Sequence, residues 1–262
     1  INNNANLNNM KKILITFTLF ITSISFAQNL QNAHWRFAVN SGADFNTFST
    51  PTPAQSVINF NNPGGSIAPA SVSDDNGNLL FYTDGNNVWD NNDQQLLNGF
   101  GLYGFSDLWC QARVLIVPKP GDLYRYYIFT LSSVGPNGGP SNGPGRGGIH
   151  YTVVDFINGV WQVNQNLKNI TLKNTAGDLI DFPLDPNQNN PVYITTETRM
   201  TSTLHRDGDK DWLTIIADFY YNLQHTKKFF NYLISSTGIN GQNDGISPTP
   251  TVESYINTPY YS

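Results

Sequence analysis

Three aspartates in one short segment have the spacing best suited to binding a metal ion. Asp207, Asp209 and Asp211 stand at alternate positions of the sequence RDGDKDW. A loop with this spacing can direct several carboxylates at one Ca²⁺ ion, which prefers oxygen ligands. A calcium loop of the EF-hand type also needs a glycine at its sixth position and a glutamate at its twelfth, where this chain has Trp212 and Asp218. The segment can be read as a calcium site or as a hairpin turn, and the incomplete ligand set favours the turn.

The sequence SDDNGNLL offers a second candidate chemistry. Ser73, Asp75 and Gly77 have the spacing of the Asp-box turn of sialidase-like propellers, although that motif is a structural turn and not a catalytic one. Glycoside hydrolysis needs two carboxylates that flank one bond. Asp75, Asp84 and Asp155 scattered over separate turns would favour a non-catalytic domain, whereas carboxylates about 5 to 10 Å apart in one pocket would favour the alternative, a hydrolase of extracellular glycans.

No other segment supplies a catalytic constellation. The sequence lacks a G-x-S-x-G nucleophile motif, and its histidines lack the H-E-x-x-H spacing. Cys110 lies in the apolar run LWCQARVLIVP, where a buried, inert thiol is expected. The histidines that lack a metal-binding spacing are His34, His150, His205 and His225. We therefore predict no catalytic residue and no cofactor other than the calcium considered above.

Tryptophans and long loops are the remaining candidates for ligand binding. Four tryptophans could line a carbohydrate or peptide groove, but they lie in or beside predicted strands, where core packing is the default. A ligand-binding rim is expected at the insertions 133–148 and 173–191, because binding residues concentrate on loops. The four tryptophans are Trp89, Trp109, Trp161 and Trp212.

The elements that must position these residues are predicted to be short β-strands. Aromatic and β-branched residues alternate with clusters of Gly, Asn, Asp and Pro, and no segment after the N-terminal apolar run has the periodicity of an amphipathic helix. One order of elements, a strand, a tight turn, an aromatic strand and a partner strand, occurs three times, over residues 67–90, 110–156 and 196–239.

Repetition of a small antiparallel sheet is typical of β-propeller blades. Phe81, Ile128 and Leu213 are the expected equivalent positions of the three aromatic strands. The first two are 47 residues apart, close to the length of about 40 to 50 residues of one blade, and insertions lengthen the second interval. We predict an all-β fold, an incomplete β-propeller of repeated antiparallel blades, with a β-sandwich as the alternative.

The N-terminal segment predicts export. A basic start at Met10 precedes the apolar run ILITFTLFITSISF, and small residues precede Gln28, as in a secretory signal peptide. We therefore predict a non-native upstream segment at 1–9, a signal peptide at 10–27 and a propeller-like domain at 28–262. The mature chain is expected to be secreted or held at the cell surface and to contain no membrane span.

The net charge of the chain indicates whether nucleic acid is an expected partner. The chain has 14 Lys and Arg against 19 Asp and Glu, a formal net charge of −5. Both lysines of the predicted signal segment would be lost on cleavage, which makes the mature domain more negative still. This balance gives no electrostatic reason to expect nucleic acid as a partner.

Four segments resemble the N-terminal propeller-like region of large secreted Bacteroidota proteins. They are HWRFAVNSGADFN, SDDNGNLLFYTDGNNVWD, QARVLIVPKPGDLYRYYIFT and GIHYTVVDF. The resemblance implies a chain exported by type IX secretion and associated with gliding motility. It also implies a longer protein, with PKD repeats and a type B sorting domain beyond residue 262.

Together these features predict a non-catalytic binding or scaffold domain of an exported, adhesin-like protein. A carbohydrate or a cell-surface protein is the expected partner.

Overall fold

The computed structural model describes residues 30–38, 41–46, 50–58, 67–104, 112–132, 148–177, 193–194, 199–221 and 224–256. Within these ranges the regular structure consists of β-strands and two short 3₁₀ helices, η1 (Leu30–Asn32) and η2 (Gln165–Leu167). The prediction of an all-β fold is confirmed. None of the helices described has the length and apolar character of a membrane span. The predicted signal peptide, Cys110 and Trp109 lie outside the described residues.

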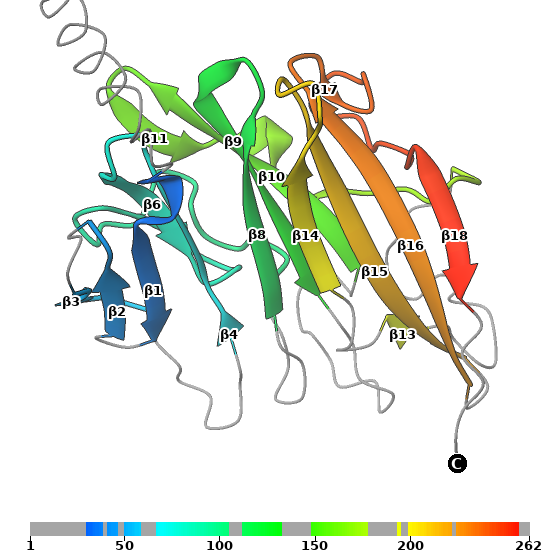
Figure 1. Ribbon diagram of the computed structural model, residues 1–262, viewed down its shortest axis with the longest axis horizontal. Coiled ribbons are helices and arrows are strands. Elements are labelled where there is room, and N and C mark those ends of the chain that lie inside the picture. The colour runs from blue at the N-terminus through cyan, green and yellow to red at the C-terminus, as the bar shows by residue number, and fades with distance from the viewer. Residues whose placement is uncertain are drawn as a thin grey trace, which may run out of the picture.

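The strands form four sheets, which we number in chain order (Figure 1). The first sheet contains β1 (His34–Ala38), β2 (Ser41–Asp44) and β3 (Thr52–Ala54). The second contains β5 (Ala70–Ser73), β6 (Leu79–Thr83) and β7 (Val88–Asp90). Both sheets are antiparallel meanders in which each strand pairs with the next.

The third and fourth sheets are longer. The third contains β4 (Ile67–Ala68), β8 (Ala112–Lys119), β9 (Asp122–Ser132), β10 (Gly148–Ile157), β11 (Val160–Val163) and β12 (Ile170–Thr171). The fourth contains β13 (Tyr193–Ile194), β14 (Arg199–Leu204), β15 (Asp211–Tyr221), β16 (Gln224–Ser235), β17 (Gly238–Ile239) and β18 (Val252–Ile256). The pairing is antiparallel except between β4 and β8.

The three predicted units correspond to the second, third and fourth sheets. Phe81, Ile128 and Leu213 lie on the middle strands β6, β9 and β15, and all three side chains are fully buried. The first sheet was not anticipated as a unit of its own, because its strands are short and its aromatic residues remain exposed. Within the described ranges the four sheets do not close into a ring.

Both faces of the third sheet are buried. Along β9, Tyr127 and Phe129 belong to the core shared with the fourth sheet, whereas Tyr126 and Ile128 belong to the core shared with the second. This alternation follows from the period of two residues along a strand. It explains why the sequence YYIFTL is apolar or aromatic at nearly every position instead of alternating with polar residues.

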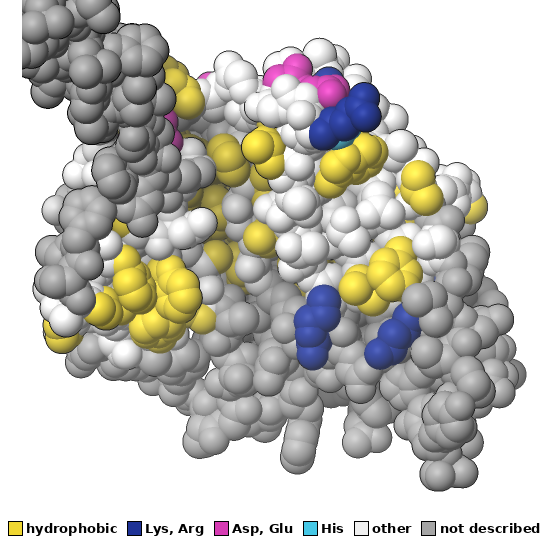
Figure 2. Space-filling model, viewed as in Figure 1, with side chains coloured by type: hydrophobic (Ala, Val, Ile, Leu, Met, Phe, Trp, Pro, Cys, Tyr) yellow, Lys and Arg dark blue, Asp and Glu magenta, His cyan; other side chains and the backbone are white. Residues whose placement is uncertain are grey.

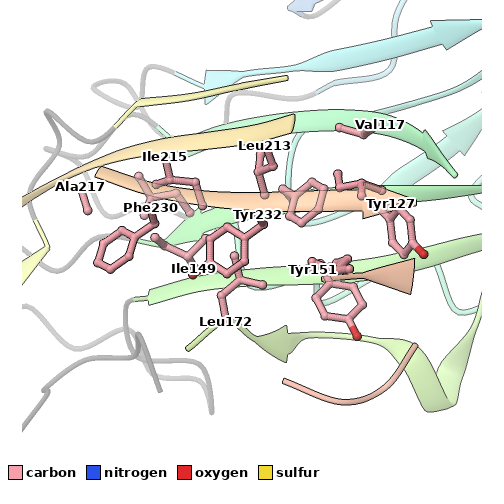
Figure 3. Packing of buried hydrophobic residues seen from close by; sticks show 14 of the residues in the cluster. Val117, Tyr127, Ile149, Tyr151, Leu172, Leu213, Ile215, Ala217, Phe230 and Tyr232 are labelled. Atoms are coloured by element: carbon pink, nitrogen blue, oxygen red, sulfur yellow. The ribbon is translucent and has the colours of Figure 1, made fainter. Parts of the chain in front are cut away.

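The larger core lies between the third and fourth sheets. Figure 3 shows Tyr127, Ile149 and Tyr151 of the third sheet close to Leu213 and Tyr232 of the fourth. These side chains are at most 1% exposed. Because removing a large core side chain costs about 3 to 5 kcal/mol, this interface contributes much of the stability of the fold.

Successive sheets approach one another most closely through four strands, which we call the leading strands: β1, β5, β8 and β14. β1 lies against β5, β5 against β8, and β8 against β14. Among the described residues, all four have a backbone edge without a strand partner over most of their length. β1, β5 and β14 each pair on one side only, and β8 pairs with β4 only at Ala112 and Arg113.

A close contact of the chain with β8 makes one glycine indispensable. Gly85 has a φ of +92°, and a Cβ at this position would lie 2.7 Å from Cγ2 of Val114. Gly159 has a similar φ of +85° with no atom within 4 Å of its would-be Cβ. We expect Gly85→Ala to destabilise the protein by about 1 to 3 kcal/mol more than Gly159→Ala, since only the first adds overpacking to backbone strain. Urea unfolding of both variants measures the difference, and equal losses would contradict the contact.

Candidate functional site

The three aspartates of the calcium prediction lie around the turn between β14 and β15. Asp207 is within 3.5 Å of Lys210 and 3.3 Å of the His205 ring, and Asp209 is 3.2 Å from Lys210. Asp211 begins β15, where burial raises its pKa. The arrangement is that of a hairpin turn with carboxylates paired to nearby cations.

Within the described ranges, no group of three or more His, Cys, Asp or Glu side chains is arranged to hold a metal ion. Calcium binding by Asp207, Asp209 and Asp211 therefore stays a prediction. A test is calcium titration of the purified protein followed by thermal unfolding, because a ligand that binds the native state raises its stability.

The turn at residues 74–78 is built as a tight β-hairpin connection. Gly77 has the positive φ expected of it, +81°. The carboxylate that closes the turn is that of Asp74, not Asp75 as the sequence suggested. It accepts hydrogen bonds from the backbone N–H groups of Asn76 and Asn78, at 2.9 and 2.8 Å. Asp75 instead accepts a bond from Gln31 at the surface.

The remaining carboxylates considered for glycoside hydrolysis have separate structural partners. Asp84 accepts bonds from the N–H groups of Asn86 and Asn87 in the turn after β6. Asp155 lies near the end of β10 and binds Arg125. Asp75 and Asp84 therefore lie in separate turns, whereas Asp155 lies within β10 and not in a turn.

A buried ionic cluster connects the third sheet to the segment between β17 and β18. Arg125 donates to Asp155 at 2.5 Å and to Asp244 at 2.8 Å, so one guanidinium joins two carboxylates. Asp244 also accepts from Lys119 at 2.9 Å and from the Tyr127 hydroxyl at 2.7 Å. Both carboxylate side chains are only 7% exposed.

This cluster is unsuited to acid–base catalysis. Burial acts to raise the pKa of Asp244, but hydrogen bonds from Tyr127 and Lys119 and the positive charges of Lys119 and Arg125 outweigh it, so the pKa is lowered. A general acid at neutral pH needs the opposite shift. Because all its charges are paired, the cluster is a structural clamp between the third sheet and the β17–β18 segment.

A groove of about 400 Å³ lies along the leading strands of the first three sheets. Its size falls within the usual range for small-molecule sites, about 300 to 1,000 Å³. β1 and β8 each contribute three consecutive residues, and β5 contributes Ala70 and Ser71 together with the preceding Pro69. The groove therefore follows the edges of these three strands. The lining residues are Asn32, Trp35, Arg36, Phe37, Pro69, Ala70, Ser71, Val114, Leu115 and Ile116.

The lining of the groove combines apolar side chains with a few polar ones and contains no carboxylate among its described residues. Arg36 is its charged residue. The Ser71 hydroxyl donates to the backbone oxygen of His34, which ties β5 to β1 at one side of the groove. A mostly apolar surface with a few polar groups is the usual composition of a ligand site.

Exposed aromatic residues border the groove on the first sheet. Trp35 is 49% exposed, Phe37 42% and Phe45 41%. Trp35 lies 5.9 Å from Phe37 and 5.2 Å from Phe45 between ring centres, so the three rings form one cluster. Figure 2 shows hydrophobic side chains gathered over the first sheet and in the hollow beside it.

Trp35 is not among the four tryptophans that the sequence predicted as possible groove residues. Trp161 packs against Phe81 and Tyr126 in the core, as the default interpretation expected. Trp89 stacks on Tyr82, and Trp212 packs beside a histidine ring. The signal for Trp35 was its spacing: aromatic residues two positions apart on a short strand share one face.

The expected ligand-binding loops fall mostly outside the described residues, which omit 133–147 and 178–192. The histidines occupy separate environments. His34 binds the backbone oxygen of Gly77 at 2.8 Å, His150 is buried, and His205 lies beside Asp207.

No family model, curated protein or solved structure matches the chain. The groove, its aromatic border and the ionic clamp therefore have to be interpreted from their own chemistry.

Proposed function

We propose that this chain is a non-catalytic extracellular recognition domain that binds a glycan along the groove between β1, β5 and β8. The observation that carries the proposal is the exposed cluster of Trp35, Phe37 and Phe45 beside a groove whose described lining has no carboxylate. The C–H-rich face of a sugar ring packs well on an aromatic ring, and each such contact removes apolar area from water.

We further propose that the sheets are blades of an incomplete β-propeller. The middle strands β6, β9 and β15 hold the same place in the element order of their units, and successive sheets come closest at their leading strands, as blades do around a propeller axis. The groove then corresponds to the central channel, where several blades contribute to one site. A β-sandwich accounts less well for a third sheet that is buried on both faces.

The alternative function, hydrolysis of extracellular glycans, lacks support at the groove. A hydrolase needs an acid and a second carboxylate on the two sides of the scissile bond. Asp155 and Asp244, two carboxylates that do lie near each other, are buried and shared by Arg125. The groove can hold a sugar but offers no described group to cleave it.

The proposals of export and of a relationship to secreted Bacteroidota proteins rest on sequence features. They are the basic and apolar segment at 10–27 and the four segments that resemble the N-terminal region of that group. Their test is expression in a bacterium of that phylum with N-terminal sequencing of any protein recovered outside the cell; protein retained in the cytoplasm with residues 10–27 intact would contradict them.

Glycan binding is tested by a screen of immobilised oligosaccharides with the purified protein, followed by titration of each hit. We expect Trp35→Ala to weaken binding about tenfold or more, since aromatic anchors contribute roughly 1 to 3 kcal/mol each. Tyr124→Ala is the matched control, because Tyr124 is an exposed aromatic residue, 61% accessible, that lies outside the groove.

Two results would contradict the proposal. Equal affinities of the Trp35→Ala variant and the unaltered protein would remove the groove from the binding site. Mass analysis that finds cleaved ligand would replace recognition by hydrolysis.

A further inference from the structure

Among the described residues, the arginine of the groove lacks a carboxylate partner, unlike the two cations of the ionic clamp. Arg36 donates from Nη1 to the backbone oxygen of Trp35 at 3.3 Å, and its guanidinium lies 5.9 Å from the centre of the Tyr82 ring. Within the described ranges no carboxylate oxygen lies within 4 Å of it, and its buried Nε has no hydrogen-bond partner. By contrast, Arg125 and Lys119 are both paired with Asp244.

The positive charge of Arg36 is opposite in sign to the net charge of the whole molecule. The chain carries a formal net charge of −5, which repels anions in general. At the groove this repulsion is offset locally, because the described lining holds one cation and no anion. A guanidinium with unpaired donors is well suited to a carboxylate, which it can bind through two parallel hydrogen bonds.

The position of the groove at a strand edge explains how one ligand can meet the arginine and the aromatic rings together. Neighbouring residues of a strand point to opposite faces, so Trp35 and Phe37 share one face of β1 and Arg36 occupies the other. The groove runs along the open edge of β1, and side chains from both faces border it. A sugar ring on the aromatic side can therefore carry an acidic group toward Arg36.

From this arrangement we propose that the groove selects acidic glycans, whose sugar residues bear carboxylates. Arg36 binds the carboxylate, and Trp35 with Phe37 supports the sugar ring. This inference rests on the proposed function, because it names the class of glycan that the same groove takes.

Two other occupants are outcomes of the test. An extended peptide could pair with the open edges of β1 and β5, as added strands do in other domains. A second copy of the chain could cover the exposed aromatic face of the first sheet, since the other sheets of this fold are covered on their apolar faces.

A matched pair of probes tests the charge directly: trigalacturonate and its methyl ester, which differ in the carboxylate charge. By isothermal titration we expect the acid to bind about tenfold or more tightly than the ester, because only the acid can form charge-assisted hydrogen bonds with the guanidinium. Arg36→Gln should remove most of that preference, so that acid and ester bind this variant with affinities within about twofold of each other. Arg36→Lys should restore part of it, since the charge returns without the planar fork.

Salt dependence provides an independent measurement. Raising the salt concentration should weaken binding of the acid by unaltered protein and leave binding of the ester nearly constant, because screening acts on the ionic contact. Circular dichroism of the Arg36→Gln variant checks that it is folded.

The inference is overturned if acid and ester bind equally, or if Arg36→Gln leaves the preference unchanged. Binding of neutral oligosaccharides without preference for the acid would refute it while leaving the proposed function intact. Failure of every glycan to bind would refute both. Binding of an unstructured peptide in competition at the groove, or a concentration-dependent dimer abolished by Trp35→Ala in sedimentation experiments, would assign the groove to one of the other two occupants.

Discussion

Replacing Asp244 with asparagine is expected to lower the free energy of unfolding by about 3 to 5 kcal/mol, the usual cost of removing one partner of a buried ion pair. Asp244 accepts bonds from Lys119, Arg125 and Tyr127, and its side chain is 7% exposed. An asparagine amide has one accepting oxygen and directs its NH₂ group at the remaining donors. Lys119, itself 11% exposed, would keep its charge without a carboxylate.

Asp209→Asn is the matched control for this substitution. Asp209 also pairs with a lysine, at 3.2 Å, but its side chain is 68% exposed. Surface pairs contribute little, so we expect a change of about 0.5 kcal/mol or less. Urea unfolding followed by tryptophan fluorescence measures both variants. A loss below about 1 kcal/mol for Asp244→Asn would show that the cluster is not a clamp.

The pH dependence of the clamp has a defined sign. Because the pKa of Asp244 is lowered in the folded protein, its contribution to stability is present above the ordinary aspartate pKa. It is lost as the pH falls through the folded pKa, where the carboxylate is protonated and the ionic bonds to Lys119 and Arg125 end. In Asp244→Asn this acidic part of the stability curve should be flatter than in the unaltered protein.

Much of the strand pattern could be predicted from the sequence, because it depends on local signals. Gly77 and Gly85 stand in segments rich in Asp and Asn, a composition that predicts turns, and both have a positive φ in the structure. The run YYIFTL predicts a strand buried on both faces, as β9 is. These signals located the middle strands of three sheets. They did not identify the first sheet, whose strands are short and half-exposed.

The functional groups were harder to predict, because their arrangement depends on contacts between distant residues. Asp244 lies 119 positions from Arg125 along the chain, and no motif connects them. The groove likewise joins β1, β5 and β8, which are separate in sequence. The spacing of Asp207, Asp209 and Asp211 is instead a local pattern, and in the structure Asp207 and Asp209 pair with the cations and the histidine of their own turn.

His150 is expected to make the stability of the protein depend on pH in the range where histidine titrates. The side chain is 2% exposed on β10, packs edge-on against Tyr103, and its Nδ1 has no hydrogen-bond partner among the described residues. Burial lowers the pKa of His150 from 6.5 to about 4. The folded protein therefore holds this imidazole in its neutral form at pH values where the unfolded chain is already protonated.

The direction of this pH dependence follows from the difference in proton binding between the unfolded and folded states. Between about pH 6.5 and pH 4 the imidazole of His150 binds a proton in the unfolded state but not in the folded state, so the free energy of unfolding falls as the pH falls. Over this whole pH range the free energy of unfolding falls by about 3 kcal/mol, and between pH 7 and pH 5 it falls by about 2 kcal/mol. Replacing His150 with phenylalanine should abolish this part of the pH dependence, whatever it does to the stability at pH 7.

Thr130→Val is the matched control, because Thr130 is the cross-strand partner of His150, is equally buried and has no titratable group. It should shift stability by the same amount at pH 7 and pH 5. Urea unfolding at the two pH values measures both variants, with His150→Gln as a second neutral replacement should phenylalanine overfill the site. If the two His150 variants kept the full loss of about 2 kcal/mol between pH 7 and pH 5, the pH dependence would have to come from other groups, and the buried neutral imidazole would not be its cause.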